Sequence, residues 1–175
     1  MWNGPSVKEN SPVSVVVLDA GPLIHLDELE RISLLSEYGE ILIPSDVWAE
    51  VVQHRPKLAL VSLPGAVLLT DVPALPPRLA ALILEKDLGR EEQAALAWLS
   101  LFGGGLMLSD DQDARRAASV LGFQVTGTVG ILVRAQRQGR LGRDELIGLV
   151  GTLRTRTSLH VSNDFITAVL ASIPQ

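Results

Sequence analysis

Hydrophobic residues of this chain form short, near-continuous runs, separated by longer segments with helical periodicity. The short runs do not alternate between apolar and polar residues, which is typical of strands buried on both faces of a parallel sheet. These runs cover residues 14–18, 41–43, 66–69, 106–108 and 123–125. Strands that alternate with helices predict right-handed crossovers. We therefore expect an α/β fold, with a doubly wound parallel sheet of about five strands flanked by helices.

The segments between and after these runs carry apolar residues at helical spacing. The first predicted helix runs from Pro22 to Tyr38, with a leucine or isoleucine at every third position and a proline that suits the first turn. The second covers Ser45–Gln53, and Ser45 or Asp46 is its candidate N-cap. Further helices are predicted at 76–89, 90–102, 111–122, 128–139, 142–154 and 162–172.

Length and composition predict one domain behind a short tail. With 175 residues, 47% of them hydrophobic, the chain can bury a sizeable core. We expect a flexible tail at residues 1–12, without the pattern of a secretory signal, and a single domain at 13–175. The absence of cysteine excludes disulfides, thiolate metal sites and a cysteine nucleophile, and fits a cytoplasmic protein. No apolar stretch reaches the roughly 20 residues of a spanning helix, so no membrane partner is expected.

Charge is distributed unevenly along the chain. The net charge is −5, but residues 1–113 hold 7 Lys/Arg against 17 Asp/Glu, whereas residues 114–175 hold 8 Arg against 3 Asp/Glu. The two parts therefore carry −10 and +5. This asymmetry predicts an acidic site beside a basic surface.

Six acidic residues follow predicted strands or open predicted helices. They are Asp19, Glu50, Glu91, Glu92, Asp110 and Asp111. Ligands of open α/β sheets bind outside the carboxyl ends of the strands, so we expect these side chains to meet at one edge. Crowded carboxylates need a compensating cation, and oxygen ligands favour Mg²⁺ or Mn²⁺ over Zn²⁺. Taken singly, each acid is also explained as a helix cap or a solvated helix residue.

Four sequence blocks resemble the PIN-domain nucleases, in particular a prokaryotic branch related to VapC-type toxins. The blocks read "VVLDAGPLIHL", "ILIPSDVWAEV", "GREEQAALA" and "LMLSDDQDARRAASVLGFQVTGTVGILVRAQRQG", and they extend over most of the chain. The order and spacing of four blocks make this match far more specific than any one motif. The resemblance implies a parallel sheet flanked by helices, and acids that bind Mg²⁺ or Mn²⁺ to hydrolyse RNA.

Carried over to this sequence, the resemblance implies a metal-dependent endoribonuclease with an acidic two-metal site, and a role as the toxin of a toxin–antitoxin pair. The implied catalytic residues are Asp19, Glu50, Glu91, Asp110 and Asp111. All of these except Asp110 are implied metal ligands, and Glu92 is a candidate substitute acid. The branch usually reads Gly-Glu-x-Glu-Ala, whereas here Gln93 replaces the second Glu. The alternative is therefore a catalytically degenerate PIN-like module that binds RNA or protein without cleaving it.

A receiver-like phosphoacceptor domain is a further alternative. It requires an acid pair after the first strand and a lysine after the last. The chain has a single Asp19 at the first place and no lysine in "VTGT", so the sequence disfavours it.

Three residues are candidate contacts for RNA phosphates. Thr128 follows the last predicted strand at a helix start, where anions are favoured, although a helix cap explains it equally well. Arg115 and Arg116 follow the acid pair, and we expect one of them beside the site and the other on a solvated face. His25 is expected to be a packed residue and not a ligand. The implied partners are RNA, a small antitoxin protein and a second copy of the chain in a homodimer.

Overall fold

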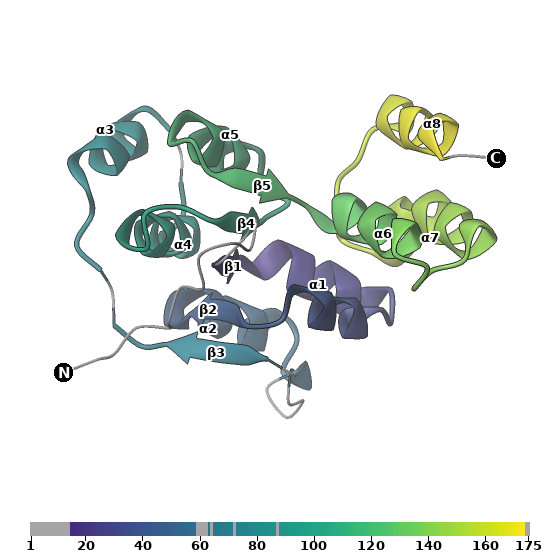
Figure 1. Ribbon diagram of the computed structural model, residues 1–175, viewed down its shortest axis with the longest axis horizontal. Coiled ribbons are helices and arrows are strands. Elements are labelled where there is room, and N and C mark those ends of the chain that lie inside the picture. The colour runs from purple at the N-terminus through teal and green to yellow at the C-terminus, as the bar shows by residue number, and fades with distance from the viewer. Residues whose placement is uncertain (1–14, 59–62, 64, 72, 87, 174–175) are drawn as a thin grey trace.

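The computed structural model describes residues 15–58, 63, 65–71, 73–86 and 88–173, and it contains a five-stranded sheet in which every strand pair is parallel (Figure 1). The strands are β1 (Val16–Leu18), β2 (Ile41–Pro44), β3 (Ala66–Leu69), β4 (Leu106–Leu108) and β5 (Gln124–Thr126). Their order is β3-β2-β1-β4-β5, so β1 is central. The predicted α/β fold with five parallel strands is confirmed, whereas the tail predicted at residues 1–12 lies outside the described residues.

Helices cover both faces of the sheet. They are α1 (Ala20–Glu28), the 3₁₀ helix η1 (Ile32–Tyr38), α2 (Ser45–His54), α3 (Pro77–Glu85), α4 (Arg90–Leu101), α5 (Gln112–Val120), α6 (Thr128–Arg137), α7 (Arg143–Arg156) and α8 (Asn163–Ser172). One core cluster joins the sheet to α1, α2, α6 and α7, and the other joins it to α3, α4 and α5. None of the helices in the described part of the chain has the length and apolar character needed to cross a bilayer.

The first predicted helix is in fact two elements, which corrects the expectation of one helix from Pro22 to Tyr38. The α-helix ends at Glu28, and Glu30 takes a left-handed conformation with φ 59°. There the Arg31 N–H donates to the Leu26 carbonyl at 2.7 Å. The chain continues as a 3₁₀ helix, whose repeat of three residues per turn equals the apolar spacing read from the sequence. The predicted caps of α2 are also wrong, because Pro44 occupies the N-cap and no side chain bonds there.

The edge strand β3 departs from the predicted burial on both faces. β1 and β4 are buried throughout because they lie inside the sheet, between other strands and under helices. β3 has neighbours on one side only, and Val67 and Leu68 are 39% and 50% exposed. An apolar run predicts a strand, but its position in the sheet decides how much of that strand is covered.

Candidate active site

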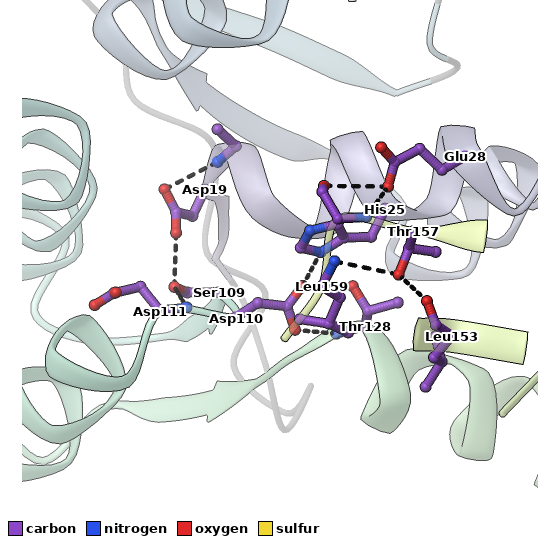
Figure 2. Close-up of polar contacts among 12 residues, drawn as sticks. Asp19, His25, Glu28, Ser109, Asp110, Asp111, Thr128, Leu153, Thr157 and Leu159 are labelled. Atoms are coloured by element: carbon purple, nitrogen blue, oxygen red, sulfur yellow. Dashed lines mark hydrogen bonds and ion pairs between the residues drawn. The ribbon is translucent and has the colours of Figure 1, made fainter. Parts of the chain in front are cut away.

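The residues that follow β4 point alternately to the two faces of the sheet. Leu106 and Leu108 belong to the core under α1 and α6, whereas Met107 belongs to the core under α4. Because strand side chains alternate with a period of two, this pattern directs Asp110 toward α1 and α6, and Asp111 toward α4 and α5. Figure 2 shows the two carboxylates on opposite sides of the loop. The same alternation in β1 directs Asp19 to the α4 side, with Val17.

Asp19 is both the N-cap of α1 and a buried acid of the site. Its side chain is 3% exposed, and its Oδ1 accepts from the Ala20 N–H at 2.9 Å. Its Oδ2 accepts from the Ser109 hydroxyl at 2.6 Å. Burial, together with the charges of Glu50 and Asp111, raises the pKa of Asp19 from 3.8 to about 7 against the opposing effect of these hydrogen bonds. The capping explanation is therefore confirmed for this residue, and the same side chain is a buried acid at the edge of the sheet.

Asp111 is likewise a helix cap at the site. Its Oδ1 accepts from the Ala114 N–H at 2.7 Å at the start of α5, and the residue is exposed. The Asp111 N–H donates to the Ser109 hydroxyl oxygen at 3.2 Å. Ser109, which is fully buried, thus connects the two acids that follow β1 and β4. The sequence analysis missed Ser109, although its place directly between a strand and an acid pair was a usable signal.

The remaining acids of the site come from α2 and α4, which pack against each other. Partial burial and the charge of Glu91 raise the pKa of Glu50. Burial, together with the charges of Asp19, Glu91 and Asp111, raises the pKa of Glu92 from 4.5 to about 7. Glu92 also carries a buried Oε2 that has no hydrogen-bond partner among the described residues. Carboxylates from four separate segments therefore repel one another at this edge.

The two glutamates of α4 act on different charged neighbours. Glu92, predicted only as a substitute, is the one whose charge interacts with Asp19 and Asp111, whereas Glu91 interacts with Glu50. Gln93, the departure from the family pattern, points elsewhere: its Nε2 donates to the Leu88 carbonyl at 2.8 Å. The replacement of a glutamate at position 93 therefore removes no charge from this cluster.

Asp110 is held away from the other acids. Its Oδ1 accepts from the Thr128 N–H at 2.8 Å, and its Oδ2 accepts from the Thr128 hydroxyl at 2.5 Å. His25 Nδ1 lies 2.8 Å from the same Oδ2. Thr128, predicted as a phosphate contact, is fully buried, and both of its donors bond to Asp110. His25 is a packed residue, as expected, but it has a specific polar partner.

The two arginines after the acid pair have different surroundings, one beside the acid-bearing loop and one on an exposed face, as the sequence predicted. Arg115 is half-buried, and its Nη1 lies 3.5 Å from the Ser109 carbonyl oxygen. Arg116 is exposed and pairs with Asp113 one turn earlier in α5. A cation at position 115 therefore lies against the acid-bearing loop.

The other arginines of residues 114–175 do not gather at the acids. Two of them pair with acids of the first half of the chain, and one acid of the second half pairs with an arginine of the first. The pairs are Arg140–Glu37, Arg156–Glu30 and Arg31–Glu145. The uneven charge along the sequence is therefore partly neutralised in space, while Arg115 lies against the acid-bearing loop.

The donor set suits a hard divalent cation. All donors are carboxylate oxygens, the ligands that Mg²⁺ and Mn²⁺ prefer. The unpartnered Glu92 Oε2 and the raised pKa of Asp19 indicate an uncompensated negative charge, which a cation would relieve. As the side chains stand, no three acidic or imidazole groups among the described residues are close enough together to hold one ion. Mutual repulsion separates carboxylates that lack a counter-charge.

Comparison with known proteins addresses the whole domain. The family model described as PIN domain matches residues 15–175. This range contains every acid of the site and every described helix and strand. A search of curated proteins found no match to the chain.

Proposed function

The chain belongs to the PIN-domain family, whose members are generally nucleases that use divalent metals, and on this premise we propose that it is an Mg²⁺- or Mn²⁺-dependent endoribonuclease. The observation that carries the proposal is the buried Asp19, whose pKa is raised to about 7 by burial and by the charges of Glu50 and Asp111. Retaining a carboxylate in such surroundings destabilises the fold. A protein that keeps several of them together has a use for the charge.

In the proposed site, Asp19, Glu50, Glu92 and Asp111 hold the cation, with Glu91 beside Glu50. The chemistry that a divalent ion supplies there is activation of water and stabilisation of the leaving oxygen of a phosphodiester. The chain supplies the remaining functions. The Ser109 hydroxyl orients the Asp19 carboxylate, and the N-cap bond of Asp111 fixes its Oδ1, which leaves Oδ2 available.

Arg115 is proposed to bind the substrate. Its guanidinium lies against the acid-bearing loop, where it can offer hydrogen bonds to a phosphate of the RNA backbone. A single cation of this kind contributes to affinity irrespective of base sequence. The proposal extends, through the resemblance to the toxin branch, to a small antitoxin that neutralises the nuclease and to a homodimer.

The test is cleavage of a panel of labelled single-stranded and structured RNAs in Mn²⁺, with EDTA as the first control. Wild-type protein should cleave in Mn²⁺ and lose all cleavage in EDTA. Asp19→Asn and Glu92→Gln should lose at least 100-fold in rate, on the order expected when a charged group of the reaction centre is removed. Glu85→Gln, at an exposed position of α3, is the matched control and should retain activity.

Calorimetric titration of Mn²⁺ separates the alternatives. A wild-type protein that binds no Mn²⁺ at millimolar concentration and cleaves no RNA is the degenerate binding module. Cleavage that survives Asp19→Asn, with Mn²⁺ still required, would show that the reaction takes place away from this edge of the sheet.

A further inference from the structure

Asp110 belongs to a buried hydrogen-bond network that joins three elements of the fold. It follows β4 by two residues, and its carboxylate accepts from Thr128 at the start of α6 through both the backbone N–H and the hydroxyl. On the other side, its Oδ2 lies 2.8 Å from Nδ1 of His25, on α1. Figure 2 shows these groups converging on Asp110 from two helices. Since a carboxylate offers only acceptors, His25 is a donor here, with its proton on Nδ1.

Two glycines leave room for this carboxylate. A Cβ on Gly21, in the first turn of α1, would lie 3.3 Å from the Asp110 Cβ. A Cβ on Gly127, the N-cap of α6, would overlap Asp110 Oδ1 and also approach Arg115 Nη1. The backbone of two elements thus comes close to the Asp110 side chain from both sides.

The network uses most of the hydrogen-bonding capacity of Asp110 and gives it surroundings different from those of the acids of the cation site. Three donors bond to the two carboxylate oxygens, which is most of the hydrogen bonds that a carboxylate can accept. Two of these donors belong to Thr128, whose position is fixed by the start of α6. Asp110 is not among the charges that raise the pKa of Asp19 or of Glu92, although its neighbour Asp111 is. Adjacent residues of one acid pair therefore have different surroundings.

We propose that Asp110 is a positioning residue, and that His25 and Thr128 act through it to place the loop formed by residues 109–111. This loop carries Ser109, which orients Asp19, and Asp111 itself. α1 connects the two ends of the arrangement, because it begins beside Asp19 and carries His25 on its second turn. The inference rests on the proposed function for its kinetic consequences but not for its structural ones. Removal of a group that holds a metal ligand in place usually lowers the metal affinity or the reaction rate by about one to two orders of magnitude.

The test uses pairs of variants that remove a donor or preserve it. His25→Ala removes the donor, whereas His25→Asn places an amide nitrogen where Nδ1 lies. Thr128→Val removes the hydroxyl at nearly constant shape, whereas Thr128→Ser retains it. His25→Ala and Thr128→Val should lower kcat at least tenfold with less than a threefold change in KM, and should weaken Mn²⁺ binding at least fivefold. His25→Asn and Thr128→Ser should stay within threefold of wild type in each quantity.

Two outcomes overturn the proposal in an active protein. In the first, the His25→Ala and Thr128→Val variants have a lower melting temperature but keep the kcat and Mn²⁺ affinity of the wild type. The network would then be merely structural. The second is Asp110→Asn abolishing Mn²⁺ binding as completely as Asp111→Asn, because Asp110 would then be a ligand.

Amide resonances in ¹H–¹⁵N spectra give a readout that needs neither cleavage nor metal. The Asp111 N–H bonds to Ser109, and the Ala20 N–H bonds to Asp19. Both resonances should shift in His25→Ala and return in His25→Asn. Shifts confined to the immediate neighbours of His25 would overturn the positioning role even if the wild-type protein proved inactive. A protein that shows the expected shifts but neither binds Mn²⁺ nor cleaves RNA would refute the proposed function alone.

Discussion

Asp19→Asn should make the metal-free protein more stable at pH 8 while it abolishes activity. In the folded protein, burial raises the pKa of Asp19 from 3.8 to about 7, so at pH 8 the fold must retain a charge that its surroundings disfavour. Asparagine keeps the oxygen that accepts from the Ala20 N–H. Its amide can donate to the Ser109 hydroxyl oxygen, because that hydroxyl is free to rotate and accept.

The magnitude follows from the linkage between ionisation and unfolding. Because the folded pKa is raised, the destabilisation is absent below pH 3.8 and complete above about pH 7. At roughly 1.4 kcal/mol per pKa unit, the destabilisation by the ionised Asp19 amounts to about 4 kcal/mol at pH 8 and to under about 2 kcal/mol at pH 5. Desolvation of the new amide offsets part of the gain. A net stabilisation of about 2 kcal/mol at pH 8 is expected, or about 5 °C in melting temperature for a domain of this size.

The assay is urea denaturation of both proteins in EDTA at pH 5, 6.5 and 8. The difference between variant and wild type should widen as the pH rises, and Asp71→Asn, at an exposed position, should show almost none. Added Mn²⁺ should stabilise the wild type and leave Asp19→Asn nearly unchanged. A variant that is no more stable than wild type at pH 8, or a difference independent of pH, would refute the account of Asp19 as an uncompensated buried acid.

Three further predictions concern residues around the acids. Gly127→Ala should destabilise the protein by about 2 kcal/mol in thermal unfolding, because its Cβ would overlap a buried carboxylate, whereas Gly148→Ala, in open space on α7, should be neutral or stabilising. Arg115→Ala should raise KM for RNA about three- to tenfold at 0.1 M salt with little change in kcat, and Arg116→Ala should leave both unchanged; equal effects would contradict the assignment of the phosphate contact. Gln93→Glu should not tighten Mn²⁺ binding in calorimetry and should lose about 1 kcal/mol of stability, because a carboxylate would face the Leu88 carbonyl; tighter binding would show that position 93 belongs to the cation site.

The sequence alone predicted the sheet and the edge at which the acids meet. Near-continuous apolar runs of three to five residues indicated parallel strands, and the acids placed after them were expected to share one edge because parallel strands end on the same side. That reasoning was sufficient to bring Asp19 and Asp111 together from positions 92 residues apart. The same local patterns did not reveal the break after Glu28, since an apolar spacing of three fits an α-helix and a 3₁₀ helix alike.

Only the tertiary structure decided which partners each acid has. Asp110 and Asp111 are the same residue type at adjacent positions, and the distinction between them lies in the donors that α1 and α6 bring to one face of β4. Thr128 seemed a candidate phosphate contact because the sequence cannot show that a carboxylate already occupies its donors. Secondary structure follows from patterns local to the chain. The protonation, burial and partners of a side chain depend on residues that folding brings next to it, and those are set by how the helices pack on the sheet.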